Sequence, residues 1–286
     1  MCYNPIHFPL EKSYIEPIVE EQTVQVKVSL IVTTYNWPQA LRKVLENVKQ
    51  LVEYPHEVII ADDGSGQETI DLINAYQGDF PCALIHSWQQ DAGFRAALSR
   101  NKAIQKSSGD YIVFLDGDTM INPSFIKDHR LSAQQGMFVQ GKRAYINEQA
   151  SRHLLESDRA AHTLMIGLEH RDQSFRLAFL PTFMTETVKT QINRGMGGNC
   201  AFWKKDIIQA NGYNIDFEGW GPEDIEFCQR LLNAGLKCKR LRFKATCFHI
   251  FHKLRSRKML DKNQLIYQNT VSNQLTRCKN GLEQSK

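Results

Sequence analysis

The chain has 286 residues, of which 42% are hydrophobic and 23% are charged, as is usual for a globular protein with a substantial core. The net charge is only +4, and the segment from Lys253 to the C-terminus carries +6, so the preceding chain is near −2. This distribution excludes a nucleic-acid-binding surface over the whole protein and leaves a local anionic partner for the basic end.

The seven cysteines are scattered along the chain without a Cys-x-x-Cys pair. This pattern argues against a disulfide framework or a zinc site and fits a reducing compartment. The first 21 residues contain four glutamates and no apolar stretch of the signal-peptide kind, and no run is long enough to cross a bilayer. We therefore expect a cytoplasmic protein.

After an expected N-terminal extension (residues 1–25), short apolar runs alternate with amphipathic segments. Strands are predicted at 26–32, 57–61, 82–87 and 111–115, and helices at 39–51, 68–76 and 94–107. This alternation predicts an α/β fold with a doubly wound, mostly parallel sheet.

The first two strands end in polar turns, Thr33-Thr-Tyr-Asn36 and Asp62-Asp-Gly-Ser65. Parallel strands place both turns at the same edge of the sheet, where open α/β folds bind ligands. No Gly-x-Gly-x-x-Gly follows the first strand, which disfavours a dinucleotide site. A carboxylate of the second turn can accept hydrogen bonds from a base or ribose, although such a turn also commonly caps a helix.

Segment 90–101 crosses from a loop into the next helix near the same edge. Its Arg95 and Arg100 can hold phosphate or orient the loop; the alternative is that both are ordinary surface arginines.

The strand at 111–115 ends in Asp116-Gly-Asp118. Its unbroken apolar run is typical of a strand buried on both faces, and the glycine lets both carboxylates reach one place. Two oxygen ligands at a sheet edge suit Mg²⁺ or Mn²⁺. The alternative is a turn with solvated aspartates.

The regular alternation ends after Asp118. Segment 145–195 is polar and lacks a strand pattern, so we expect helices and loops there. A glycine-rich loop that begins at Arg194 leads into a short strand, a helix is predicted at 223–234, and a strand is predicted near 241–248.

Segment 217–227 contains Trp220 between two glycines, a ring that can stack on a sugar. Glu223 and Asp224 follow at the start of a predicted helix, where acids are also favoured for structural reasons. Opposite a metal-bound leaving group, a carboxylate here can act as general base.

His249 and His252 end the last predicted strand. Residues three apart on a strand face opposite sides, so only one of these histidines needs to complete the metal site.

Together these blocks resemble the family 2 glycosyltransferases, which have the GT-A fold. The resemblance covers residues 26–255 and lies in segment 28–36, Asp62-Asp-Gly-Ser65, Asp116-Gly-Asp118 and Gly219-Trp-Gly-Pro-Glu-Asp224. The last block also resembles the C-terminal motif of chondroitin-polymerase-like and β-1,4-galactosyltransferase-like enzymes. The resemblance implies a nucleotide-binding half (26–120) and an acceptor and catalytic half (121–255), followed by a basic tail (256–286).

The resemblance assigns roles by position. Asp224 is the expected base and Glu223 its partner acid, and Asp118 with His252 is expected to hold Mn²⁺ or Mg²⁺, with His249 as second choice. Trp220, Gly221 and Glu223 are expected at the sugar and acceptor. The residues expected at the donor nucleotide, with Arg100 added from its position, are Thr33, Tyr35, Asp63, Arg100 and Asp116.

The resemblance also implies an inverting transfer from a nucleotide sugar, with UDP as the expected nucleotide, to a glycan or lipid-linked glycan of a bacterial surface polysaccharide or lipopolysaccharide. A sugar nucleotidyltransferase is one alternative, but it would not need block 219–224. A non-catalytic sugar-binding module is another, but it would tolerate loss of the acids that are present here.

Basic residues follow directly after His252, among them Arg257, Lys258 and Lys262. They can dock peripherally on the inner face of an anionic membrane, or Lys253 and Arg255 can hold the donor diphosphate while the rest are solvated.

Overall fold

The computed structural model describes residues 26–177, 186–192, 198–253 and 256–285. The expected N-terminal extension (1–25) and residues 193–197 of the glycine-rich loop lie outside the described residues.

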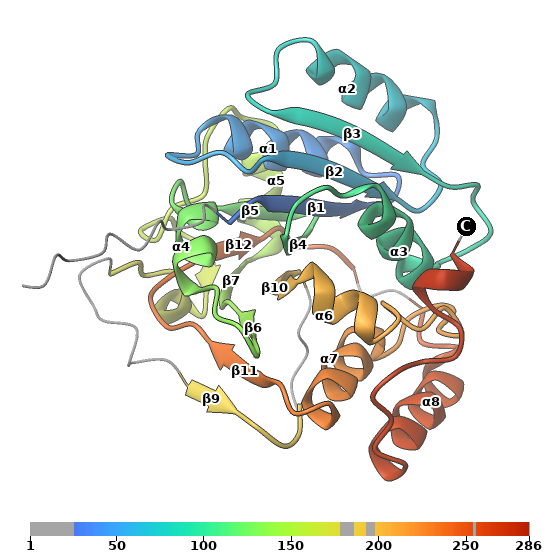
Figure 1. The fold of residues 1–286 in the computed structure, drawn as a ribbon. Helices are drawn as coiled ribbons and strands as arrows, with labels where there is room; N and C mark the ends of the chain where they lie inside the picture. The colour runs from blue at the N-terminus through green and yellow to red at the C-terminus, as the bar shows by residue number, and fades with distance from the viewer. Residues whose placement is uncertain (1–25, 178–185, 193–197, 254–255, 286) are drawn as a thin grey trace, which may run out of the picture.

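The first half of the chain forms the predicted alternation of strands and helices (Figure 1), and its boundaries lie within about two residues of those predicted. In chain order the elements are β1 (Val28–Thr34), α1 (Pro38–Lys49), β2 (Glu57–Asp62), α2 (Gln67–Gln77), β3 (Ala83–Trp88), α3 (Ala96–Lys106) and β4 (Tyr111–Asp116).

An eight-stranded sheet, in the order β3-β2-β1-β4-β10-β6-β11-β9, forms the centre of the molecule. The first four strands are mutually parallel. β10 (Asn199–Trp203) is antiparallel to β4 and to β6 (Met137–Gln140), while β11 (Lys237–Arg240) is parallel to β6 and antiparallel to β9 (Glu186–Val188). The expected mostly parallel α/β sheet is confirmed.

A second sheet lies beside the carboxyl end of β4, since its first strand begins directly after Asp118. It contains β5 (Thr119–Ile121), β12 (Cys247–His249), β7 (Arg143–Ile146) and β8 (Leu168–Glu169), in the order β5-β12-β7-β8.

Two sequence-based expectations in the second half are wrong. Segment 145–195 contains the expected helical structure, in α5 (Glu148–Leu155) and the 3-10 turn η1 (Arg171–Gln173), but it also contains β8, β9 and the end of β7, where no strand was expected. Strands of two or three residues are too short to show alternation, and their pairing partners are distant in sequence. Of the strand expected near 241–248, only residues 247–248 lie in a strand, β12, because β11 already ends at Arg240. Between the two strands Phe243 and Ala245 have positive φ angles of 61° and 47°, which an extended strand does not allow.

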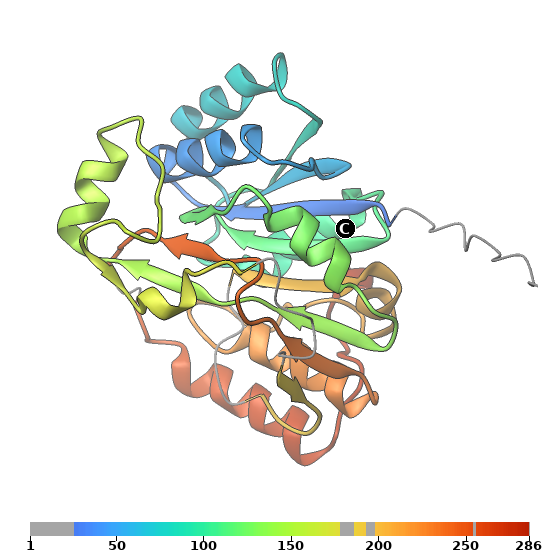
Figure 2. The same cartoon turned by 90° about the vertical axis from the view of Figure 1, so that its left-hand side faces the viewer.

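Helices cover both faces of the large sheet (Figures 1 and 2). One core cluster joins the strands to α1, α2 and α4 (Phe125–Ser132), and the other joins them to α3, α6 (Lys204–Gln209) and α7 (Glu223–Asn233). A smaller cluster joins the second sheet to α5 (Glu148–Leu155). Leu30, Ile31 and Val32 of β1 are fully buried, as expected for a strand covered on both faces.

The segment after residue 255, expected as a basic tail, packs as part of this fold. It contains α8 (Leu260–Ser272) and η3 (Leu282–Gln284). Thr270 donates a hydrogen bond of 2.8 Å to Glu226 of α7, and Gln105 of α3 donates one of 2.7 Å to the carbonyl of Leu282. The C-terminus accordingly lies beside α3 in Figure 1.

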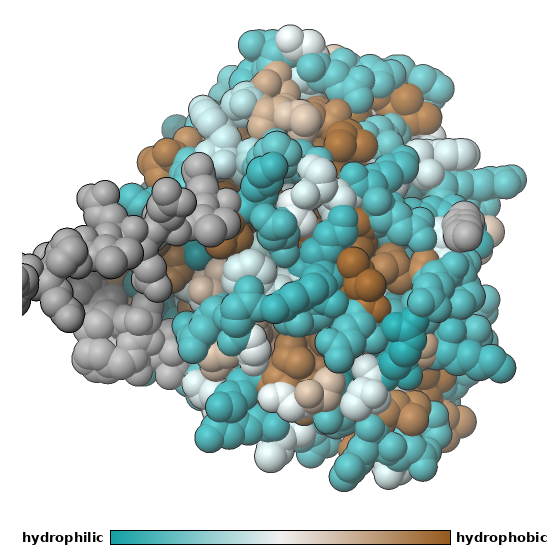
Figure 3. All heavy atoms as spheres, in the orientation of Figure 1, coloured by the Kyte–Doolittle hydropathy of each residue, from teal (hydrophilic) through white to brown (hydrophobic). Residues whose placement is uncertain are grey.

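The face shown in Figure 3 is mostly hydrophilic, with hydrophobic residues in small, separate patches. Within the described part of the chain, none of the helices combines the length and hydrophobicity that crossing a membrane requires.

Candidate active site

A cavity of about 870 Å³ opens at the carboxyl edge of the parallel strands. Its lining joins the two halves of the chain and includes most of the residues singled out from the sequence: Thr33, Tyr35, Asp63, Arg100, Asp116, Asp118, Trp220, Gly221, Glu223, Asp224, His249 and His252. The polar turns that end β1, β2 and β4 therefore meet at one place because these strands are parallel neighbours.

Asp118, His249 and His252 form a cluster on this cavity. One potential ligand atom from each residue lies within 4.8 Å of the others, and the Nε2 atoms of both histidines are 3.5 Å from the Asp118 carboxylate. The expectation that only one histidine faces the site is wrong. The strand β12 ends at His249, so the alternation of side chains along a strand does not extend to His252. After β12, the backbone N–H of Ile250 donates a hydrogen bond of 2.8 Å to the carbonyl of Asp118.

The chemistry of this cluster fits a divalent cation. The Asp118 carboxylate suits Mn²⁺ or Mg²⁺ and imidazole nitrogens suit a transition metal, so the mixed set is compatible with Mn²⁺. A histidine must be neutral to bind a metal. Burial and the neighbouring Arg143 lower the pKa of His249 to about 4, so its ring is neutral at pH 7.

Asp116 lies between two arginines. Its carboxylate is 3.2 Å from Arg143 of β7 and 3.9 Å from Arg100 of α3, and the Thr33 hydroxyl is 3.3 Å away. Burial opposes ionisation of Asp116, but Arg143 and Arg100 outweigh it and hold its pKa below the ordinary value. Asp116 is therefore an anion with fixed cationic partners on both sides.

Glu223 and Asp224 occupy the first turn of α7. Arg100 donates a hydrogen bond of 2.8 Å to Glu223, and the Ile225 N–H donates one of 2.7 Å to Asp224. Burial raises the pKa of Glu223 to about 7 and also raises that of Asp224, in both cases against the opposing effect of Arg100. Both carboxyl groups therefore hold a proton more readily than carboxyl groups in water, as a general base requires.

The two arginines considered from the sequence have different positions. Arg100 is only 8% exposed and contacts the site acids, so it is not an ordinary surface arginine. Arg95 orients the loop, since its guanidinium bonds the Gln90 carbonyl at 2.9 Å and its backbone N–H bonds Asp63 at 2.7 Å.

The far end of the cavity contains the polar turns of β1 and β2. Asp63 also accepts a hydrogen bond of 2.6 Å from Gln89, and the Tyr35 hydroxyl donates one of 2.9 Å to Asp91. These contacts fix the orientation of Asp63 and Tyr35 at the rim of the sheet.

Arg143 and Tyr145 of β7 also line the cavity, although neither was predicted from the sequence. Arg143 bonds Asp116, and its Nε donates a 3.0 Å hydrogen bond to the Tyr145 hydroxyl. The signal available in the sequence was the polar–apolar alternation of Arg-Ala-Tyr-Ile, which is too short to be read as a strand.

The fold and its acidic sheet edge define a protein of the GT-A class. The structure of TarS 1–349 from S. aureus in complex with UDP matches with a TM-score of 0.58 and 16% identity over 91% of this chain and 68% of that chain. The mannosyltransferase PcManGT from Pyrobaculum calidifontis, in complex with GDP-Man and Mn²⁺, matches with a TM-score of 0.52 and 18% identity over 81% and 59% of the two chains. At these identities the similarity concerns the fold.

The chain belongs to glycosyl transferase family 2, which matches residues 29–210. The N-terminal domain of galactosyltransferase matches residues 182–253. The resemblances found in the sequence are thereby confirmed.

Two curated relatives are polysaccharide synthases. Hyaluronan synthase from Pasteurella multocida is 28% identical over 233 residues, which are 76% of this chain and 24% of the relative. Chondroitin synthase from Escherichia coli is 24% identical over 243 residues, or 79% of this chain and 35% of the relative. This chain thus spans about a quarter to a third of the length of these two relatives.

Proposed function

We propose that this protein is a metal-dependent, inverting glycosyltransferase that moves a sugar from a nucleotide sugar to a hydroxyl group of a glycan. One observation carries the proposal: the Asp118–His249–His252 cluster and the Glu223–Asp224 pair line the same cavity. A displacement reaction needs charge stabilisation at the leaving group and a base at the attacking hydroxyl, and the two groups of residues suit these two tasks.

The nucleotide of the donor is assigned to the end of the cavity formed by Thr33, Tyr35 and Asp63. The Asp63 carboxylate is held by Gln89 and by the backbone of Arg95, so it is oriented to accept hydrogen bonds from a base or ribose. UDP is the proposed nucleotide, as the family resemblance implies. Among structures that share the fold, that of TarS contains UDP and that of PcManGT contains GDP-Man, so the donor panel below includes both nucleotides.

Asp118, His249 and His252 are the residues that would hold Mn²⁺ or Mg²⁺. When bound, the cation supplies positive charge to the departing diphosphate. Arg143 and Arg100, on either side of Asp116, add fixed positive charge to the same part of the cavity.

Asp224 is the proposed general base, which takes the proton of the acceptor hydroxyl as its oxygen attacks the anomeric carbon. Burial raises the pKa of Asp224, so the carboxylate is a stronger base than one in water. Glu223 fixes Arg100 by an ion pair, and both act on the position of the donor sugar. Trp220 is proposed to stack on a sugar face.

The proposed acceptor is a glycan or lipid-linked glycan of a bacterial surface polysaccharide. The names of the relatives, hyaluronan synthase and chondroitin synthase, support polymer synthesis as the setting. The basic residues of the C-terminal segment are the proposed contact with an anionic membrane surface at the cytoplasmic side.

A donor panel tests this function. UDP-GlcNAc, UDP-GalNAc, UDP-glucose, UDP-glucuronate and GDP-mannose are incubated with the protein and Mn²⁺, and release of nucleoside diphosphate is measured with and without EDTA. We expect slow hydrolysis of one donor that requires the metal and is lost in Asp118→Ala. Hydrolysis of none of them, or hydrolysis that persists in EDTA, would contradict the proposal.

A further inference from the structure

The helix α8 lies outside both family matches, which end at residues 210 and 253, yet it contacts the loop that carries Trp220. This loop, residues 218–222, leads directly into Glu223 and Asp224 and lines the cavity with Trp220, Gly221 and Pro222. The contacts that fix this loop therefore affect the positions of Trp220, Glu223 and Asp224.

Asn263 of α8 is the main contact. Its side chain is fully buried, and its Nδ2 donates hydrogen bonds to the carbonyls of Glu218 at 2.9 Å and Trp220 at 3.0 Å. The two bonds bracket Gly219, whose φ of +69° permits the turn. A Cβ atom on Gly221 would lie 2.5 Å from Asn263 Nδ2, so the loop and the helix are in close contact.

Arg257, just before α8, contacts the same loop through the Trp220 ring. Its guanidinium lies 5.1 Å from the ring centroid, a cation–π geometry. On the nucleotide-binding side, the Gly219 N–H bonds the Phe94 carbonyl at 2.9 Å. Trp220 is thus held through its backbone by Asn263 and through its ring by Arg257.

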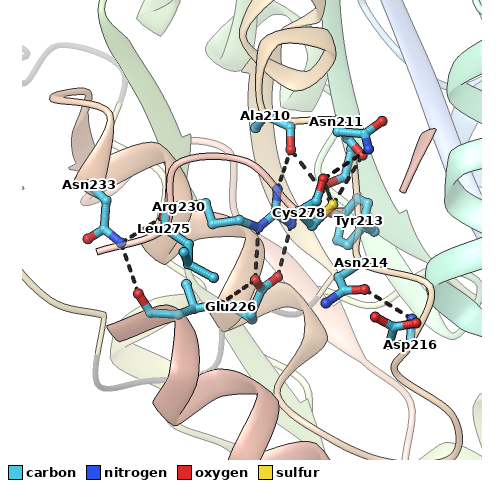
Figure 4. A network of polar contacts seen from close by, with 12 residues as sticks. Ala210, Asn211, Tyr213, Asn214, Asp216, Glu226, Arg230, Asn233, Leu275 and Cys278 are labelled. Atoms are coloured by element: carbon cyan, nitrogen blue, oxygen red, sulfur yellow. Dashed lines mark hydrogen bonds and ion pairs between the residues drawn. The ribbon is translucent and has the colours of Figure 1, made fainter. Parts of the chain in front are cut away.

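The helix α8 is itself fixed to α7, which carries the site acids. Thr270 of α8 donates to Glu226, and Glu226 forms a buried ion pair of 2.8 Å with Arg230 (Figure 4). Arg230 also donates to the carbonyls of Ala210 and Gly212. The helix α8 therefore contacts both the Trp220 loop and α7, the helix that this loop leads into, and it holds the two from the same side.

We propose that Asn263 and Arg257 are positioning residues, which hold Trp220 against the sugar and acceptor end of the cavity. Residues 257–263 then contribute to the active site, although neither family match includes them. The kinetic effect of these residues rests on the proposed function, whereas their effect on the position of Trp220 does not.

The test compares Asn263→Asp with Asn269→Asp. Aspartate keeps the size of asparagine and replaces the donating group with an oxygen, so the carbonyls of Glu218 and Trp220 lose their donor. Asn269 lies on the exposed side of the same helix and serves as the matched control. Thermal unfolding establishes that each variant is folded.

The first readout needs no activity. The protein is labelled with 5-fluorotryptophan, and the Trp220 signal is assigned in the ¹⁹F NMR spectrum by its loss in Trp220→Phe. We expect this signal to shift or broaden in Asn263→Asp and to stay unchanged in Asn269→Asp, while the signals of the other tryptophans keep their positions. An unchanged Trp220 signal in folded Asn263→Asp would overturn the inference.

The second readout is kinetic and uses the donor selected by the panel. We expect kcat in Asn263→Asp to fall between about tenfold and a hundredfold, because small displacements of positioning groups have effects of this size. Affinity for UDP with Mn²⁺ should stay within about twofold, since Asn263 does not line the cavity. An unchanged kcat, or UDP affinity that falls in parallel with kcat, would contradict the positioning role.

Arg257→Gln keeps the test decisive if Asn263→Asp does not fold, because Arg257 is exposed. It should also move the Trp220 signal and raise the acceptor KM, and an unchanged signal would overturn the inference. If the wild-type protein hydrolyses no donor, the proposed function fails while the NMR result still decides the position of Trp220.

Discussion

Glu223 and Asp224 are adjacent in sequence but have different partners. Glu223 pairs with Arg100 at 2.8 Å, whereas Asp224 accepts from the backbone N–H of Ile225 at 2.7 Å. The Glu223 carboxylate already contacts Arg100, so it is less available to an acceptor hydroxyl than the Asp224 carboxylate. The structure therefore supports Asp224 as the base and Glu223 as the residue that orients Arg100.

For Asp224→Asn we expect turnover to fall by about a hundredfold or more with UDP affinity largely intact, since asparagine keeps the shape but cannot accept the proton. Steady-state kinetics and a UDP titration measure the two quantities. Loss of UDP affinity in proportion to turnover would make Asp224 a binding residue instead.

The same pair predicts the pH dependence. Burial raises the pKa of Asp224, the proposed base, above its ordinary value, and raises that of its neighbour Glu223 to about 7. Because the base must be ionised to act, kcat should fall as the pH decreases, with a midpoint above the ordinary pKa of an aspartate. In Glu223→Gln the charge of Arg100 is no longer compensated by Glu223, so Arg100 stabilises the Asp224 carboxylate more strongly. The midpoint of the kcat–pH profile should therefore move to lower pH. An unchanged midpoint in this variant would show that the pH dependence of kcat does not arise from Glu223 and Asp224.

The two histidines give a further test at this scale. His249→Ala and His252→Ala should each weaken Mn²⁺ binding about tenfold or more, whereas alanine at the exposed His153 should have no effect. Titration of Mn²⁺ in the presence of UDP, followed by EPR, measures the affinity. Full affinity in either variant would remove that histidine from the site.

At the scale of elements, α7 joins the site to the core. Its first turn carries Glu223 and Asp224, and one turn later Glu226 and Arg230 form an ion pair in which both side chains are buried. These buried charges are satisfied by each other, by nearby carbonyls (Figure 4) and by the Thr270 hydroxyl.

Arg230→Met should lower the free energy of unfolding by about 3–5 kcal/mol, because it leaves the Glu226 carboxylate buried without its cation. Adding Glu226→Leu should restore part of the loss. As a control, Arg240→Met removes an ion pair with the exposed Glu186 and should cost about 1 kcal/mol or less. Denaturant unfolding measures all three, and equal losses for Arg230→Met and Arg240→Met would contradict this account.

In the molecule as a whole, some basic residues of the C-terminal segment contact the candidate active site, and others lie on the surface. Arg257 lies over Trp220, while Lys262 is 3.4 Å from Glu218 with both side chains more than half exposed. An exposed pair of this kind leaves much of the lysine charge available to an anionic surface.

Changing Lys258 and Lys262 to Gln, with Arg257 left in place, should weaken binding to anionic vesicles and leave donor hydrolysis unchanged. Vesicle binding of the wild-type protein should also decrease as salt is added. Co-sedimentation with phosphatidylserine vesicles measures both effects, and unaltered binding in the double variant would remove the membrane contact.

The parallel half of the fold and the residues at its edge follow from local patterns in the amino-acid sequence. Long apolar runs and amphipathic helices are local patterns, so β1 to β4 and their helices could be predicted within about two residues. The turns that follow parallel strands must meet at one edge, so the grouping of Asp63, Asp116 and Asp118 could be predicted as well.

Only the tertiary structure decided the rest, because these features depend on contacts between residues distant in sequence. Arg143 reaches Asp116 through a strand of four residues whose neighbours in the sheet are β12 and β8. His252 lies near His249 and Asp118 because β12 ends at His249, and no local pattern in the sequence predicts that end. Asn263 meets the Trp220 loop across 43 residues of chain by the packing of α8 on α7, a contact that sequence periodicity cannot reveal.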